Sequence, residues 1–165
     1  MTNVFTAPEP IFDRNYDVPS VFLAGTIDMG SSYDWQMEAA YKLSEQFVVF
    51  NPRRKNWDSS WEQSINNRNF TEQVEWELDA LDQSDYIIMN FLKESKSPIS
   101  FLELGIHIDD GKLHVICPEG FYRKGNVDIV CRRYGVPQYN TLDECIEWLL
   151  ERGTKLDVSI DLSDY

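Results

Sequence analysis

The sequence predicts an α/β protein in which a parallel sheet of about five strands is covered by helices on both faces. Short apolar runs alternate along the chain with segments of helical periodicity, and no internal repeat or low-complexity block interrupts them. Strands that alternate with helices form units whose strands run parallel. A chain of 165 residues, 42% of them hydrophobic, is long enough to bury the core of one such domain.

The predicted strands are short apolar runs that end at residues unfavourable to a strand. The first run, VFLA, stops at Gly25, and the second, FVVF, stops at Asn51-Pro52. Pro118 closes a later run in the same way. We expect strands at 21–24, 47–50, 86–91 and 113–117, with a short strand or turn near 138–139.

Helical patterns fill the intervals between these strands. Apolar residues recur at helical spacing from Phe70 to Leu81, which predicts one amphipathic helix. Thr141 followed by Glu144 has the spacing of a capping box and marks the start of the last helix. The expected helices cover 34–46, 70–83, 99–110 and 126–134, and a final segment after Thr141.

The two ends of the chain lack this alternation. Residues 1–20 hold three of the seven prolines and predict an extended N-terminal arm, residues 21–152 the folded domain, and residues 153–165 an acidic C-terminal tail. The first residues lack the basic start and apolar stretch of a signal peptide. No apolar run approaches the length of a membrane span, so we expect a cytoplasmic protein without a membrane partner.

Charge and cysteine content narrow the classes of function. A formal net charge of −13 argues against binding a nucleic-acid polymer, which requires a broad basic surface. A small phosphorylated ligand stays possible, because it needs only one local cationic pocket. The three cysteines form no CxxC pair, and only two histidines are present, so no metal site is expected. Glycine-rich dinucleotide and P-loop motifs are missing from the sequence, and we expect no cofactor.

Glu103 is the most unusual polar residue, because it lies within the apolar stretch SPISFLELG. Ionised carboxylates are rare among buried residues unless their desolvation is offset. The apolar neighbours at 99, 101, 102, 104 and 106 are expected to leave little solvent-facing arc around it. Such a carboxylate is a candidate nucleophile or acid/base. The alternative is a partly exposed acidic residue near a helix start.

Further candidates follow the predicted strands at their carboxyl ends, where ligands bind in parallel sheets. Glu77 lies at the edge of its helix's apolar stripe and faces either the core or water. Arg53 and Arg54 follow the second strand and pair either with an anion or with a carboxylate of the chain. Gly25 and Thr26 would let a ligand approach the backbone. Three tryptophans are candidates for stacking on a base or for packing: Trp35, Trp57 and Trp61.

The chain resembles the nucleoside 2-deoxyribosyltransferase-like family in four stretches, which extend from about residue 21 to about residue 150. They are VFLAGTIDMGSSYDWQ, NPRRKNWDSSWEQ, FTEQVEWELDALDQSDYIIMNF, and SPISFLELG followed by CPEGFYRKGNVDIVCRRY. The resemblance implies a flavodoxin-like three-layer sandwich. It also implies an enzyme that cleaves the N-glycosidic bond of a nucleoside or nucleotide, as a 2-deoxyribosyltransferase or as an N-glycoside hydrolase.

The same resemblance assigns roles to individual residues. Glu103 of the ELG motif is the expected nucleophile towards the anomeric carbon, and Glu77 the acidic residue that assists at the sugar or base. Phe22 stands where relatives place a tyrosine hydroxyl near the nucleophile. Ser97 matches a serine that contacts phosphate in the related deoxynucleoside 5′-monophosphate N-glycosidases, whereas Asp28 replaces an arginine of those enzymes.

Family sites are completed by a neighbouring subunit through a residue near Asn126, so the resemblance implies a homodimer or higher homo-oligomer. The expected ligand is a small-molecule nucleoside or nucleotide. Two other interpretations stay open. One is a TIR-like NAD glycohydrolase, which shares a related fold and a helix glutamate. The other is a non-catalytic nucleotide-binding protein, which stays open because Phe22 and Glu77 differ from the residues that the family pattern has at these positions.

Overall fold

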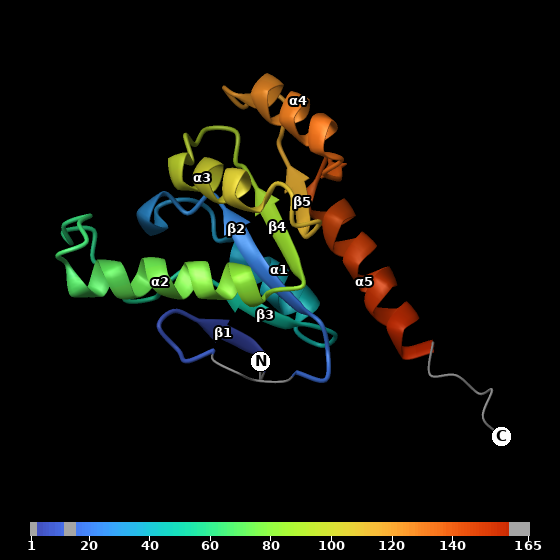
Figure 1. Cartoon of the computed structure of the whole chain (residues 1–165), viewed down its shortest axis with the longest axis horizontal. Coiled ribbons are helices and arrows are strands. Elements are labelled where there is room, and N and C mark those ends of the chain that lie inside the picture. The colour runs from blue at the N-terminus through green and yellow to red at the C-terminus, as the bar shows by residue number, and fades with distance from the viewer. Residues whose placement is uncertain (1–2, 12–15, 159–165) are drawn as a thin grey trace.

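The computed structural model describes residues 3–11 and 16–158 and contains one sheet of six parallel strands (Figure 1). The strand order is β1-β3-β2-β4-β5-β6. The strands are β1 (Val4–Thr6), β2 (Ser20–Gly25), β3 (Val48–Asn51), β4 (Tyr86–Asn90), β5 (Leu113–Ile116) and β6 (Gln138–Tyr139). Without β1, the remaining strands follow the order 2-1-3-4-5, which is the flavodoxin-like order.

The sixth strand, β1, comes from the segment for which the sequence predicted only an extended arm. It pairs with β3 in parallel, with Phe5 opposite Phe50 and Thr6 opposite Asn51. A strand of three residues at a sheet edge is too short to carry a periodic signal. At the other end of the chain, helix α5 continues to Val158, past the predicted start of the tail at 153. Residues 159–165 of that tail lie outside the described residues.

Helices cover both faces of the sheet, which confirms the three-layer prediction (Figure 1). One face packs against α2, α3 and α4 through Trp76, Leu81, Leu104 and Val127. The other face packs against α1 and α5, and their core residues include Trp35, Leu43, Ile146 and Leu149. The helices are α1 (Trp35–Leu43), α2 (Arg68–Gln83), α3 (Pro98–His107), α4 (Lys124–Tyr134) and α5 (Leu142–Val158), with a 3₁₀ turn η1 (Asp28–Gly30).

Strand β2 shows how alternation along the chain builds these two cores. Val21 and Leu23 point into the core with α1 and α5, whereas Phe22 and Ala24 point into the core with α2, α3 and α4. All four side chains are buried, so the strand is apolar throughout, as in other sheets covered on both faces. The part of the chain that the structure describes has no helix that meets the length and apolarity of a membrane span.

The three cysteines are free, buried and divided between the two cores. Cys117 and Cys131 lie in the core with α2, α3 and α4, and Cys145 lies in the core with α1 and α5. Burial raises the thiol pKa of Cys117 and of Cys131 to about 11, and that of Cys145 to about 12. These thiols are therefore protonated at neutral pH.

Side-chain caps set the start of several helices. Asp34 accepts a hydrogen bond from the backbone of Met37 at 3.0 Å, and Asn67 accepts one from the backbone of Phe70 at 3.1 Å. The Asn67 cap starts α2 at Arg68, two residues before the predicted start. Thr141 accepts from the backbone of Glu144 at 3.2 Å, as the capping-box spacing predicted.

The carboxyl ends of β2 and β4 meet at the point where the strand order reverses. Gly25 ends β2 with φ +129°, and a Cβ at this position would lie 2.2 Å from the carbonyl oxygen of Asn90. Only glycine therefore permits this approach. The backbone of Thr26 then donates to the same Asn90 oxygen at 3.0 Å, which places the loop after β2 beside the loop before α3.

Candidate active site

Glu103 lies on α3 with its side chain turned into the protein and only 9% exposed. The apolar neighbours do not surround it as the sequence suggested. Ile99, Leu102 and Ile106 are 59%, 60% and 50% exposed and form the outer face of the helix. The inner face carries Ser100, Glu103, Leu104 and His107. Glu103 is therefore buried, as expected, but these three neighbours do not bury it, because helical spacing puts them on the face opposite the carboxylate.

Burial raises the pKa of Glu103 to about 8, and the neighbouring Glu77 carboxylate adds to the increase. Glu77, on α2, is half-buried, and desolvation raises its pKa to about 7. The Gln73 side chain opposes that increase by donating a hydrogen bond to Glu77 Oε1 at 2.7 Å. The structure therefore brings together the two carboxylates that the sequence singled out.

Two interacting carboxylates with raised pKa values titrate as a pair. Near neutral pH, repulsion between them favours the state in which one is protonated and the other ionised. Such a pair can supply a nucleophilic oxygen and a proton within one site. Among the described residues, no group of three His, Cys, Asp or Glu side chains is placed to hold a metal ion.

A chain of hydroxyl groups connects the loop after β2 to the start of α3. Thr26 Oγ1 lies 2.6 Å from Ser97 Oγ, which lies 2.8 Å from Ser95 Oγ. Ser95 donates to the carboxylate of Asp28 at 2.7 Å. Asp28 and Ser97 both adopt left-handed backbone conformations, with φ +49° and +47°. Three predicted site residues, Thr26, Asp28 and Ser97, are thus linked, with the Asp28 carboxylate at one end.

Phe22 is fully buried and packs against Trp76, with ring centroids 6.4 Å apart. Its ring belongs to the core beneath α2. Phe22 therefore packs the core and, because it has no hydroxyl group, cannot donate a hydrogen bond to a substrate.

The adjacent arginines behave differently from each other. The guanidinium of Arg53 donates to the backbone oxygens of Gly30 and Ser32 at 2.9 and 2.7 Å, and Arg53 Nη1 donates to the Tyr33 oxygen at 3.2 Å. Arg53 Nε also lies 3.6 Å from a carboxylate oxygen of Asp34. Arg53 therefore holds the loop after β2 in place.

Arg54 has no ion pair among the described residues. Its guanidinium carbon lies 5.1 Å from the centre of the Trp61 ring, and its Nε and Nη1 are buried without a hydrogen-bond partner. The Nε1 of Trp57 is likewise buried and unpartnered, and the Trp57 ring centre lies 5.3 Å from that of Trp61. Of the two arginines, Arg54 is the one with unused donors.

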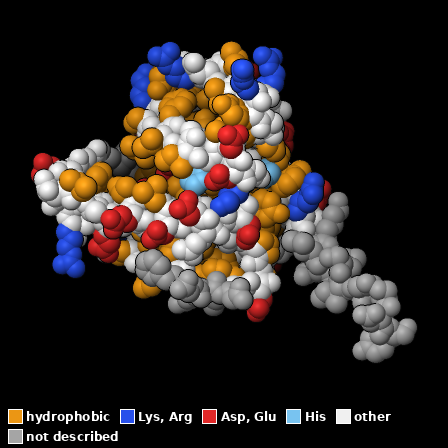
Figure 2. Space-filling model, viewed as in Figure 1, with side chains coloured by type: hydrophobic (Ala, Val, Ile, Leu, Met, Phe, Trp, Pro, Cys, Tyr) orange, Lys and Arg blue, Asp and Glu red, His pale blue; other side chains and the backbone are white. Residues whose placement is uncertain are grey.

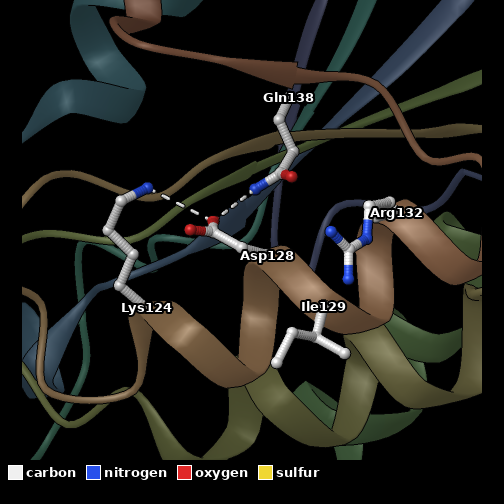
Figure 3. A pocket seen from close by; sticks show the side chains of 5 residues that line it. All are labelled: Lys124, Asp128, Ile129, Arg132 and Gln138. Atoms are coloured by element: carbon white, nitrogen blue, oxygen red, sulfur yellow. Dashed lines mark hydrogen bonds and ion pairs between the residues drawn. The ribbon is translucent and has the colours of Figure 1, made fainter.

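Asn126 is exposed on α4. The same helix borders an open hollow of about 520 Å³ (Figure 3). Within it, Asp128 accepts hydrogen bonds from Lys124 at 3.2 Å and Gln138 at 2.8 Å. Its lining contains neither Glu103 nor Glu77, so the hollow is separate from the carboxylate pair.

Two residues of the site were not predicted from the sequence. Gln73 precedes Glu77 by one helical turn and also donates to the Pro52 oxygen at 2.9 Å, so it fixes the Glu77 carboxylate relative to the end of β3. The four-residue spacing on one helix was the available signal for this contact. Ser95 carried no such signal, because its partner Asp28 is 67 residues away along the chain.

Comparison with solved structures supports the fold. The chain is similar to the crystal structure of a conserved protein from Enterococcus faecalis V583, with a TM-score of 0.58 and 8% sequence identity. The similarity covers 82% of this chain and 99% of that one. A search of curated protein sequences gave no significant match.

Comparison with protein families assigns the chain more specifically. Residues 18–121 match the family described as nucleoside 2-deoxyribosyltransferase like. The matched segment runs from the start of β2 to the loop after β5 and includes Glu77, Ser97 and Glu103. This chain therefore belongs to the nucleoside 2-deoxyribosyltransferase-like family.

Proposed function

We propose that this protein cleaves the N-glycosidic bond of a (deoxy)nucleoside or nucleotide through a covalent intermediate on Glu103. One observation carries the proposal: in a member of this family, a buried glutamate on α3 lies close enough to the Glu77 carboxylate for that charge to raise its pKa. Members of this family are expected to process nucleosides, and a paired carboxylate site is suited to substitution at an anomeric carbon.

In the proposed first step, the ionised Glu103 carboxylate forms a bond from one oxygen to the anomeric carbon. The bond from that carbon to the base nitrogen breaks, and its electron pair leaves with the base. This step requires the proton of the pair to lie on Glu77, which then supplies it to the departing base. In the second step, water or another base attacks the anomeric carbon, the bond from that carbon to the Glu103 oxygen breaks, and the proton of the attacking group passes to the ionised Glu77. Water gives a hydrolase, and a base gives a transferase.

Other residues of the site would bind and orient the substrate. The hydroxyl group of Ser97 is suited to contact the sugar, because Ser97 lies at the start of the helix that carries Glu103, and the Thr26 hydroxyl lies 2.6 Å from that of Ser97. Gly25 lets the end of β2 pack against the Asn90 backbone, which places Thr26 beside the loop before α3. The buried Phe22 would support this wall from beneath.

The proposal includes a homo-oligomer, in the cytoplasm, whose neighbouring subunit uses Asn126 to complete the site. Exposed apolar side chains support it, and Figure 2 shows them gathered over α3 and α4. The patch consists of Ile99, Leu102, Ile106, Tyr122, Ile129, Val130 and Tyr134. Contiguous apolar patches of this kind mark interaction surfaces.

A non-catalytic nucleotide-binding protein is a second candidate. The observation that favours it is the raised pKa of Glu103, because a carboxyl group with a pKa of about 8 is mostly protonated at neutral pH and is then a weak nucleophile. In the enzyme, the ionised fraction or a proton transfer to a neighbouring group must supply the reactive form. Turnover measurements separate the two candidates.

The test is chromatography of purified protein incubated with each deoxynucleoside and each deoxynucleoside 5′-monophosphate, with and without a second free base. NAD is included as a further substrate. Free base released without an acceptor identifies a hydrolase, and an exchanged nucleoside identifies a transferase. Nicotinamide release would instead favour a TIR-like NAD glycohydrolase.

The Glu103→Ala variant should lose turnover while keeping a native melting curve. When the reaction is quenched early, the wild-type protein should gain the mass of one deoxyribosyl group from a nucleoside, or of one phosphodeoxyribosyl group from a 5′-monophosphate. A fully active Glu103→Ala variant would exclude the proposed nucleophile. Binding of nucleotides without turnover of any substrate would favour the non-catalytic protein.

A further inference from the structure

Three unsatisfied donors cluster in the loop between β3 and α2. They are the Nε and Nη1 groups of Arg54 and the Nε1 group of Trp57, all buried and without a hydrogen-bond partner. Buried donors without a partner are rare in folded proteins, and a cationic group without one is particularly costly. Since Arg54 has no carboxylate partner among the described residues, the missing acceptor is best supplied from outside the chain.

The loop that carries these donors begins next to Glu77 of the carboxylate pair. Gln73 donates to both the Pro52 oxygen and Glu77 Oε1, and so it connects the start of the loop to the site at 2.9 and 2.7 Å. Arg54 follows Pro52 by two residues. A ligand whose reacting carbon lies at Glu103 can therefore extend a second group towards the Arg54 guanidinium.

The other two anion contacts predicted from the sequence, Arg53 and Ser97, are already engaged within the chain. The guanidinium of Arg53 donates to backbone oxygens of the loop after β2. The hydroxyl chain through Ser97 ends at the carboxylate of Asp28, whose negative charge would repel a phosphate there. Of the two adjacent arginines, Arg54 is therefore the one with unpartnered donors among the described residues.

We propose that Arg54 and Trp57 bind an anionic group of the substrate, namely the phosphate of a nucleoside monophosphate that is cleaved at Glu103. The inference rests on the proposed function for the identity of the rest of the substrate. Phosphate oxygens accept charge-assisted hydrogen bonds from a guanidinium, and the indole N–H adds a third donor. The Trp61 ring, now 5.1 Å from the guanidinium carbon, moves aside when the phosphate enters. The loop permits this movement because residues 52–67 contain neither helix nor strand.

The experiment measures binding by calorimetry in the Glu103→Gln background, so that no substrate is consumed. The probes are a deoxynucleoside 5′-monophosphate, the matching deoxynucleoside and inorganic phosphate. We expect the monophosphate to bind about tenfold or more tightly than the deoxynucleoside, because a hydrogen bond to a charged group is among the strong ones. Tryptophan fluorescence should change with the monophosphate and with phosphate, since Trp57 and Trp61 lie at the site.

Adding Arg54→Gln should remove this preference, weakening the monophosphate about 10- to 100-fold while leaving the deoxynucleoside unchanged. Trp57→Phe keeps an aromatic ring but removes the N–H, and it should weaken only the monophosphate, by several-fold. Arg68→Gln is the matched control, because it removes one exposed positive charge at the start of α2 and should change neither affinity.

Equal affinity of the two ligands before mutation would overturn the inference, as would equal losses for both ligands in Arg54→Gln. If Arg54→Gln does not fold, Trp57→Phe decides by the same comparison. Failure of the proposed function gives a different result: selective binding of the monophosphate through Arg54, with no turnover by the protein that retains Glu103.

Discussion

Replacing Glu103 with glutamine should make the protein more stable at alkaline pH and have little effect in acid. The substitution keeps the shape of the side chain but removes its charge. In the folded protein the pKa of Glu103 is about 8, whereas its ordinary value is 4.5. Between these values the folded state keeps a proton that the unfolded state has released, so the stability of the wild-type protein falls as the pH rises through that window.

The size of the effect follows from the width of the window. Each pKa unit corresponds to roughly 1.4 kcal/mol. The shift of the Glu103 pKa from 4.5 to about 8 therefore makes the wild-type protein about 3–5 kcal/mol less stable above pH 8 than it is below pH 4.5. This loss is a large fraction of the roughly 5–15 kcal/mol that holds a typical domain folded. Glu103→Gln, which cannot ionise, should not show it.

Urea unfolding at pH 4, 6, 8 and 9 would measure the difference, with intrinsic fluorescence as the signal. Glu75→Gln serves as the control, because Glu75 is exposed on α2 and its replacement should leave the curve of stability against pH parallel to that of the wild type. If the wild-type and Glu103→Gln curves also run parallel from pH 4 to pH 9, the conclusion that the Glu103 carboxyl is desolvated is refuted.

Three further predictions address the surroundings of Glu103. Glu77→Gln removes the second cause of the raised Glu103 pKa, so the acidic limb of the kcat/KM profile should move to lower pH by about one unit, and a limb that stays in place would refute the coupling. Arg53→Ala removes the hydrogen bonds to the Gly30 and Ser32 oxygens and should lower the free energy of unfolding by about 2–3 kcal/mol in urea titrations; an unchanged midpoint would show that the loop holds without them. Gly25→Ala would place a Cβ 2.2 Å from the Asn90 oxygen at a residue whose φ is +129°, so it should lower the melting temperature markedly. A native melting curve would contradict the close approach.

The sequence was sufficient to predict the central sheet and the helices around it. The strands β2 to β5 are short and largely apolar, and β2, β3 and β5 end at or just before a glycine or proline; each of these properties is local to the chain. The edge strand β1 escaped prediction because its three residues are held by pairing with β3, which lies over forty residues away. Pairing of that kind leaves no periodic signal in the short segment itself.

Only the part of the site that has a local signal in the sequence was predicted. Glu103 and Glu77 stand out because a carboxylate within or beside an apolar pattern is a local feature. The different roles of Arg53 and Arg54 are not visible in the sequence, since they depend on which guanidinium faces the carbonyl groups of the loop after β2. The link from Ser95 to Asp28 likewise depends on the meeting of two loops that only the folded sheet brings together.

Because the three free thiols are divided between the two cores, their chemical modification can measure the opening of each core. An alkylating reagent reacts with thiolates, and burial that raises the pKa of Cys117, Cys131 and Cys145 to about 11–12 leaves almost none at neutral pH. Modification therefore requires that a core opens. Because Cys145 lies on one side of the sheet and the other two thiols on the opposite side, the rates at which they are modified would time the opening of each layer separately.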